Sequence, residues 1–260
     1  MSRLVTSVNH GALPVLYSFR RCPYAIRARM ALLQAELTVE LREVVLSDKP
    51  PVMLEVSPKG SVPVLVLPNG QVIEESLAIM RWALAKNDPE SWLAEIETTA
   101  LQQLLAINDG PFKQALDGYK YPERHLGACR TWRIDSENWA QRGSDLSAPT
   151  LKPDRHTGQV AEDHRAQGEA VLIALLEQRL RDQPFLNGVR SGFADVAIFP
   201  FVRQWAAVDA GWFKASRWGA VRAWLNGWLQ SEGFGRVMQK YPVWKPEQPS
   251  VVFPPPPTDR

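Results

Sequence analysis

Cys22 is the side chain of this 260-residue chain that is best placed to do chemistry. A short apolar run ends just before it, and Pro23 can occupy the first turn of a helix without losing a needed hydrogen-bond donor. The positive end and free amides of such a helix stabilise a thiolate, and Arg20, Arg21 and Arg27 lie nearby in sequence. A free cysteine is also commonly a small buried core residue, so position alone leaves both interpretations open.

Two further points along the chain are suited to form a binding site with this thiol. Val62-Pro63 lies between a glycine-containing loop and a buried strand, where a cis proline would turn the Val62 amide and carbonyl toward a ligand. Glu75 and Ser76 open a helix, so the hydroxyl and amides there can bind a carboxylate while Glu75 accepts from an ammonium group. Taken singly, the first is compatible with an ordinary trans bond and the second with a plain helix cap.

Local patterns predict the elements that would position these residues in a βαβ-ββα order. The strands carry apolar or alternating residues, the helices carry apolar faces, and Pro68-Asn69-Gly70 supplies turn residues for a hairpin. We expect strands within 13–18, 38–45, 62–67 and 72–73, helices opening at 23 and 76, and room for a short helix within 50–57.

The character of the chain changes after residue 88. Apolar residues downstream recur at helical spacing, so we expect three parts: 13–88 as a first domain, 89–245 as an all-α domain, and 246–260 as a proline-rich tail. Within the second part, 143–168 is polar and rich in helix breakers, which indicates a loop. The closely spaced tryptophans suit core packing, although aromatic rings also line apolar pockets. The tail is expected to be extended or disordered, and such a segment can also bind a partner groove.

The motifs of the first part together resemble the glutathione S-transferase superfamily. The matching stretches are Tyr17 to Ala25, Lys49-Pro50, Gly60 to Leu65 and Glu75-Ser76. The cysteine-containing branch, with the omega-like enzymes and the two-domain glutaredoxins, is the better match. The resemblance implies an α/β thioredoxin-like N-terminal domain with a mixed sheet, followed by an all-α helical C-terminal domain.

The same resemblance implies a role for each matched residue. Cys22 would form a mixed disulfide with glutathione, the co-substrate, and Tyr24 would pack beside the thiol. The other matched positions would bind the tripeptide: Lys49 at the glycyl carboxylate, Val62 with Pro63 at the cysteinyl backbone, and Glu75 with Ser76 at the γ-glutamyl end.

Tyr17 and Ser18 are rival catalytic residues, because other branches of the superfamily use a hydroxyl at the end of the first strand to stabilise the glutathione thiolate. Hydroxyl assistance suits conjugation to electrophiles, whereas a cysteine that is itself thiolated suits thiol–disulfide exchange. Ala25 stands where a dithiol motif would have its second cysteine, so a second glutathione must resolve the intermediate. Cys129 is expected to be structural and is a remote candidate resolving thiol.

The helical part is matched less specifically, through Phe193 to Ala197, which resembles the family's folding motif at the start of a core helix. The family places Ser or Thr three residues before the aspartate, whereas this chain has Gly192 there and Ser191 one residue earlier. We therefore expect Asp195 to cap the helix through an altered geometry. Residues 108–113 interrupt a long helical stretch, and sequence alone does not place them.

Composition narrows the classes of partner and cofactor. Thirty basic and 28 acidic side chains give a formal charge of +2 without a long block of either sign, which argues against nucleic acid. Two cysteines suit a reducing, cytoplasmic location, and no apolar run is long enough for a signal peptide or a membrane span. The four scattered histidines and the glycine spacing favour neither a metal nor a nucleotide cofactor.

These observations predict an enzyme: a glutathione-dependent thiol transferase or reductase that acts on a disulfide through a Cys22–glutathione mixed disulfide. A homodimer is expected by resemblance. One alternative is conjugation of glutathione to apolar electrophiles, with Tyr17 or Ser18 assisting. Another is a non-catalytic glutathione-binding or protein-interaction module, because fold alone does not fix function.

Overall fold

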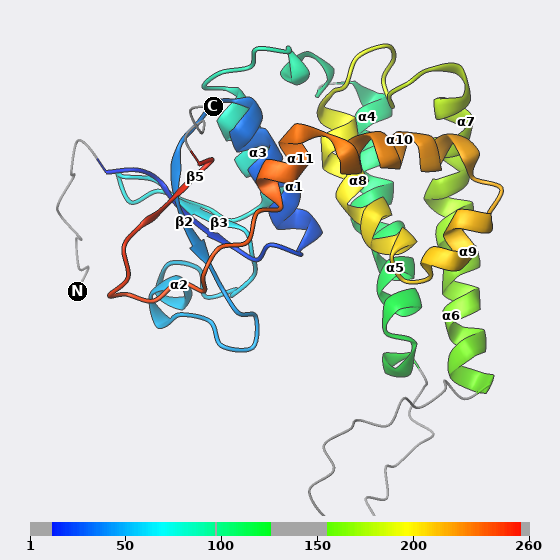
Figure 1. Ribbon diagram of the computed structural model, residues 1–260, viewed down its shortest axis with the longest axis horizontal. Helices are drawn as coiled ribbons and strands as arrows, with labels where there is room; N and C mark the ends of the chain where they lie inside the picture. The colour runs from blue at the N-terminus through cyan, green and yellow to red at the C-terminus, as the bar shows by residue number, and fades with distance from the viewer. Residues whose placement is uncertain (1–11, 97, 126–154, 256–260) are drawn as a thin grey trace, which may run out of the picture.

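The structure is a computed structural model that describes residues 12–96, 98–125 and 155–255 (Figure 1). A β-sheet with its helices occupies one side of the molecule, and a bundle of helices occupies the other. Helices α1 (Pro23–Gln34), α3 (Ser76–Leu84) and α11 (Glu232–Val237) lie between the sheet and the bundle. This arrangement confirms the predicted mixed α/β region followed by a helical region.

Within the described residues, five strands form one sheet in the order β4-β3-β1-β2-β5. The central strand β1 (Val15–Ser18) runs parallel to β2 (Val39–Glu43) and antiparallel to β3 (Val64–Val66). The β3 strand pairs in turn with β4 (Val72–Ile73). A short helix, α2 (Pro51–Val56), precedes β3. The βαβ-ββα order predicted from local patterns is confirmed.

The helical region continues from a short 3-10 helix to the end of α11. Its described elements are a 3-10 helix (Trp92–Glu95), α4 (Thr99–Ile107), a π-helical turn (Asn108–Phe112), α5 (Lys113–Lys120), a 3-10 turn (Pro122–Arg124), α6 (Arg155–Gly168), a second π-helical turn (Glu169–Ile173), α7 (Ala174–Asp182), α8 (Phe193–Ala206), α9 (Ala210–Ala215) and α10 (Gly219–Gln230).

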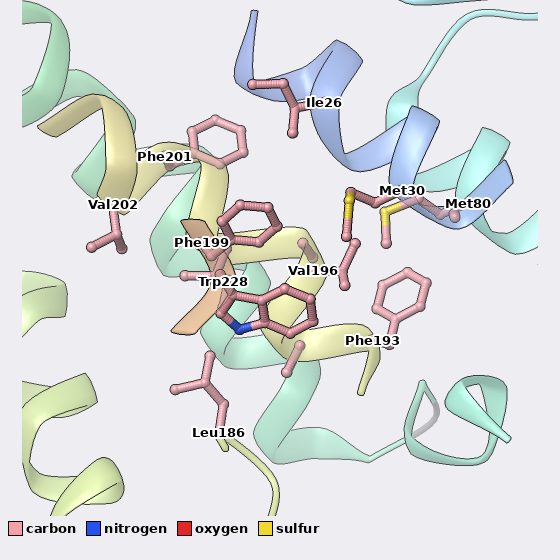
Figure 2. Close-up of a cluster of buried hydrophobic side chains, with 14 of the residues drawn as sticks. Ile26, Met30, Met80, Leu186, Phe193, Val196, Phe199, Phe201, Val202 and Trp228 are labelled. Atoms are coloured by element: carbon pink, nitrogen blue, oxygen red, sulfur yellow. The ribbon is translucent and has the colours of Figure 1, made fainter. Parts of the chain in front are cut away.

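Helix α8 forms the centre of the core and joins the two parts of the molecule. Figure 2 shows Met30 of α1 and Met80 of α3 facing Phe193 and Val196 of α8. On the opposite side, the ring of Phe199 stacks on Trp228 of α10 with the centroids 5.0 Å apart. Because α1 carries Cys22 at its start, this packing fixes the thiol relative to the helical region.

The closely spaced tryptophans are mainly core residues. Trp205 is fully buried, and Trp218, Trp224 and Trp228 are buried as well. Trp224 and Trp228 also border an apolar cavity of about 520 Å³ next to the end of α7. Core packing, the favoured interpretation of these residues, is therefore confirmed.

Asp195 holds the start of α8 from a fully buried position. Its Oδ2 accepts from the Gly192 amide at 3.1 Å, and its Oδ1 accepts from the Leu186 amide at 3.0 Å and from Nε1 of Trp224 at 2.7 Å. The carboxylate thus satisfies donors of the helix start, the preceding loop and α10 without a reciprocal hydroxyl from residue 192.

The expectation of a loop over 143–168 is wrong for its second half, because residues 155–168 form α6. The helix packs against α5, where Gly118 leaves room for His164: a Cβ atom on Gly118 would lie 2.3 Å from Cδ2 of that histidine. Packing against a neighbour rather than a strong apolar pattern accounts for this helix. Residues 143–154 lie outside the described residues, as does Cys129.

Part of the proline-rich tail forms a strand, which local patterns did not predict. The strand β5 (Val251–Phe253) pairs antiparallel with β2, and Phe253 lies opposite Val39 and is fully buried. In Figure 1 the chain after α11 returns to the sheet, where it forms β5. The chain end therefore covers the edge of β2, which would otherwise present unpaired backbone groups.

Candidate active site around Cys22

Cys22 is the N-cap residue of α1 and a free, half-buried thiol. Its amide donates to the carbonyl of Phe19 at 3.0 Å, which fixes the loop before the helix. Its Sγ donates to the carbonyl oxygen of Val62 at 3.7 Å, and the amides of Tyr24 and Ala25 hydrogen-bond to the sulfur. The sulfur therefore has both amide donors and a carbonyl acceptor around it.

Burial raises the pKa of the Cys22 thiol above its ordinary value. The hydrogen bonds from Ala25 and Tyr24 and the positive charges of Lys113 and Arg27 act in the opposite direction without cancelling the effect of burial. The donors that sequence analysis expected at the helix start are thus present, but the thiol of the unliganded protein is mainly protonated at neutral pH. The same donors stabilise the thiolate once the proton leaves.

The Val62-Pro63 peptide bond is cis. A cis bond reverses the direction of the backbone at this point, and the Val62 carbonyl faces the Cys22 sulfur. Both residues also border a cavity, so the segment just before β3 connects the thiol to a space that can hold a ligand.

This cavity has a volume of about 370 Å³, and we call it the polar cavity because most of the residues that border it are polar or charged. The residues that border it come from α1, the loop before β3, the start of α3 and the π-helical turn: Tyr24, Lys59, Ser61, Val62, Pro63, Glu74, Glu75, Ser76 and Asp109. Five residues of the predicted glutathione site therefore meet in one place: Tyr24, Val62, Pro63, Glu75 and Ser76.

Glu75 lies at the exposed rim of the cavity and forms an ion pair with Lys59. The pairing raises the pKa of Lys59, chiefly through the hydrogen bond to the Glu75 carboxylate. Because both side chains are more than half exposed, the pair contributes little to stability, and an incoming ammonium group can replace Lys59 at small cost.

Lys49 is not among the residues that border this cavity. Its Nζ lies beside Gly60, where an added Cβ atom would be 3.8 Å away. Gly60 has a φ of +63°, a backbone conformation that favours glycine. Lys59 is the lysine at the cavity rim, and sequence analysis did not single it out.

Ser76 is buried at the first position of α3, and its Oγ accepts from Nε of Arg27 at 2.9 Å. The guanidinium of Arg27 also donates to both carboxylate oxygens of Asp109, at 2.9 and 2.8 Å, and to the carbonyl of Ala197 at 3.3 Å. Arg27 thus links the first turn of α3 to the helical region. Sequence analysis noted Arg27 only as a charge near Cys22 and missed Asp109, for which the helix interruption at 108–113 was the available signal.

Tyr24 stands between two cavities and borders both. Its ring packs edge-on against Phe201 with the centroids 4.8 Å apart, and Arg27 lies over its face. Burial, with the charge of Asp109 adding to it, raises the pKa of Tyr24 to about 12. The phenol therefore stays protonated and can donate a hydrogen bond at physiological pH.

The hydroxyls of Tyr17 and Ser18 are engaged with arginines. The Tyr17 hydroxyl accepts from Nη1 of Arg42 at 2.7 Å, and the fully buried Ser18 Oγ accepts from Nε of Arg29 at 2.9 Å. Neither residue borders the two cavities that meet at Tyr24. Their hydroxyls are structural partners of β2 and α1 in this arrangement.

A second cavity, of about 660 Å³, opens on the other side of Tyr24 and contains Cys22 in its wall. Residues of α5 and α8 form much of the remaining wall, among them Lys113, Lys120 and Arg203. Cys22 therefore borders a larger space than the first cavity, and its contact with Val62 connects it to the first. This arrangement allows one molecule on each side of the thiol.

Among the described residues, no three side chains of metal-ligating type lie close enough together to hold a metal ion. No helix in this described part of the chain is long and apolar enough to cross a membrane.

Comparison with known proteins gives matches along most of the chain. Residues 16–92 match the family model of the glutathione S-transferase N-terminal domain, and 159–227 match that of the C-terminal domain. A probable glutathione transferase of Aplysia californica is 32% identical over 85 residues, which are 33% of this chain and 92% of the relative. Glutathione S-transferase U22 of Arabidopsis thaliana is 25% identical over 78% of this chain and 74% of the relative.

A solved structure of a glutathione transferase family member from Pseudomonas fluorescens, with two glutathione bound, has the same fold. Its TM-score is 0.64 at 20% identity, over 88% of this chain and 94% of that one.

Proposed function

The chain belongs to the glutathione S-transferase superfamily, and we propose that it is a glutathione-dependent thiol transferase whose nucleophile is Cys22. The observation that most strongly supports this proposal is the position of the Cys22 thiol between two cavities. Cys22 contacts Val62 at the edge of the polar cavity and forms part of the wall of the larger one. A thiol that exchanges disulfides needs access to glutathione and to a second sulfur compound.

In this proposal glutathione lies in the polar cavity with its sulfur toward Cys22. Its cysteinyl backbone pairs with Val62 beside the cis proline, and its γ-glutamyl carboxylate binds the amides and hydroxyl at Ser76. The γ-glutamyl ammonium group takes the place of Lys59 at Glu75. Lys59, once released, and Lys49 are the two candidates for the glycyl carboxylate.

The proposed reaction has two balanced steps. The Cys22 thiolate attacks a disulfide R–S–S–G at the glutathionyl sulfur, which forms a Cys22–glutathione disulfide and releases R–S⁻. A second glutathione thiolate then attacks the glutathionyl sulfur of that disulfide, which restores the Cys22 thiolate and forms oxidised glutathione. Because Ala25 stands where a second cysteine would be, the external thiol is required.

The partners of Tyr17 and Ser18 favour this reaction over hydroxyl-assisted conjugation. Each hydroxyl already accepts from an arginine and lies outside both cavity walls. Cys22 is thus the reactive group that borders the space for a second substrate. The proposal includes a reducing compartment such as the cytoplasm, where a free thiol persists, and the homodimer expected from the resemblance.

Mass spectrometry after treatment with oxidised glutathione tests the proposal. The native protein is expected to gain one glutathionyl group that excess reduced glutathione removes, and Cys22→Ala is expected to gain none. Cys129→Ser serves as the matched control and should behave as the native protein. Tyr17→Phe should retain thiol transfer to hydroxyethyl disulfide. An adduct that persists in Cys22→Ala, or full activity of that variant, would reject the role of Cys22.

A further inference from the structure

The larger cavity has a strongly asymmetric charge. Four basic side chains border it, Arg21, Lys113, Lys120 and Arg203, against the single carboxylate of Asp117. That carboxylate is already paired with Lys113, its neighbour one turn away on α5. Across the described residues, Arg21, Lys120 and Arg203 have no ion pair with a carboxylate. The cavity over the thiol therefore carries uncompensated positive charge.

Arg203 is the most informative of these cations because it is half-buried. It projects from α8 with its guanidinium over the ring of Phe234, 5.6 Å from the centroid. Burial, together with the like charge of Arg20, lowers the pKa of Arg203. A partly desolvated cation without a counterion is costly, and an anionic ligand would remove that cost.

Lys113 places this positive charge close to the chemistry. Its charge acts on the Cys22 thiol, and it stands on the same wall of the cavity as Lys120. When the Cys22 thiolate breaks a disulfide, negative charge develops on the departing sulfur. Cations fixed near that sulfur stabilise the charge as it forms, provided that they are in place beforehand.

We propose that the cavity selects an anionic second substrate: a small disulfide whose departing half carries a carboxylate, with Arg203 and Lys120 as the residues that determine specificity. This inference rests on the proposed thiol transfer for its chemistry. The carboxylate binds at the cations, and the carbon chain lies against apolar wall residues such as Phe19 and Val208. The departing carboxylate-bearing thiolate leaves as R–S⁻ while glutathione stays on Cys22.

Three mixed disulfides of glutathione, alike in length and different in the charge of the departing half, test the selection. Their departing halves are 3-mercaptopropionate, 2-mercaptoethanol and cysteamine, which are anionic, neutral and cationic at neutral pH. Each kcat/KM is divided by the rate of the uncatalysed reaction with glutathione, which removes differences in intrinsic reactivity. We expect the order anionic, neutral, cationic, with the first about tenfold above the second, as one charge-assisted contact provides.

Variants assign the preference to the named cations. Arg203→Gln and Lys120→Gln should each reduce the ratio of anionic to neutral kcat/KM by about tenfold at most, whereas Arg203→Lys should keep most of it. Lys214→Gln, an exposed neutralisation on α9, is the charge-matched control and should keep the native ratio. Because two rates are compared as a ratio, a general loss of structure that lowers all three rates together cannot produce the expected decrease in this ratio. An unchanged ratio in both glutamine variants would overturn the assignment.

A binding measurement separates this inference from the proposed function. Calorimetry with Cys22→Ser measures binding of the three mixed disulfides without reaction, and the mercaptopropionate disulfide is expected to bind most tightly. If the native protein reduces no disulfide but the mercaptopropionate disulfide still binds preferentially, the thiol-transfer proposal fails and the charge selection stands. If thiol transfer proceeds without charge preference in either assay, the selection is wrong and the proposed function stands.

Discussion

Arg27 of α1 and Asp109 of the helical region form a two-point ion pair, with Nη1 and Nη2 lying 2.9 and 2.8 Å from Oδ1 and Oδ2. The guanidinium side chain is 2% exposed and the carboxylate side chain 29%. Through Nε the same guanidinium holds the hydroxyl of Ser76, while Asp109 borders the polar cavity. The pair therefore connects the packing between the two parts of the chain to the site proposed for glutathione.

Asp109→Asn is expected to weaken both stability and glutathione binding. The change leaves the buried Arg27 without its counterion, so we expect a loss of about 2–3 kcal/mol in the free energy of unfolding, below that for a fully buried pair because Asp109 is partly exposed. Looser placement of Ser76 should raise the KM for glutathione about fivefold. Urea unfolding and initial rates measure the two effects. Asp163→Asn, on the exposed face of α6, is the control, and equal effects of both variants would contradict the assignment.

The pH dependence of Cys22 alkylation should reflect a half-buried thiol whose pKa is raised. Because burial raises its pKa, the thiolate fraction of the unliganded protein is low at neutral pH and increases with pH through the alkaline range. We expect the rate of reaction with iodoacetamide to increase in the same way. Lys113→Met removes a positive charge that lowers this pKa, so its rate profile should move to higher pH.

Lys214→Met provides the comparison for that measurement, because its side chain is exposed on α9 and outside both cavity walls. Its alkylation profile should coincide with the native one. A native rate that levels off near neutral pH would mean that the amides of Tyr24 and Ala25 outweigh burial. That result would contradict the predicted direction of the shift.

Sequence patterns predicted the first part of the fold well because its elements have strong local signals. The helix after Cys22 has Pro23 in its first turn, and β1 and β3 are short apolar runs between breakers. These features act over a few residues and need no tertiary context. By contrast, α6 carries few apolar residues, and its packing depends on Gly118, more than 30 residues earlier, in ways that a local pattern does not contain.

Some residues of the candidate site were likewise predictable from local patterns, and others were not. Cys22, Val62-Pro63 and Glu75-Ser76 were found from residue types and their places relative to strands and helices. The structure brings Val62-Pro63 and Glu75-Ser76 around one cavity, with the Cys22 sulfur in contact with Val62. The link from Arg27 to Asp109 spans 82 residues and depends on a π-helical turn, so no spacing rule reveals it. Sequence does not indicate which of Lys49 and Lys59 reaches the cavity, whereas in the structure Lys59 borders it and Lys49 does not.

The last prediction concerns β5, the strand that local patterns did not reveal. Phe253 is fully buried and lies opposite Val39 of β2, with the guanidinium of Arg29 over its ring at 5.9 Å. Phe253→Ala leaves a cavity between the sheet and α1, so we expect it to lower the free energy of unfolding by about 3–4 kcal/mol. Urea unfolding followed by tryptophan fluorescence measures this change.

Val252→Ala is the matched control for β5. Successive side chains of a strand point to opposite faces, and Val252 is 38% exposed, so its truncation should cost less than about 1 kcal/mol. A large loss of stability in Phe253→Ala with a small loss in Val252→Ala is expected if β5 pairs with β2 in the register of the structure. Two small and equal effects would mean that the chain end does not dock on the sheet in solution. The β2 edge would then be open to pairing with another chain.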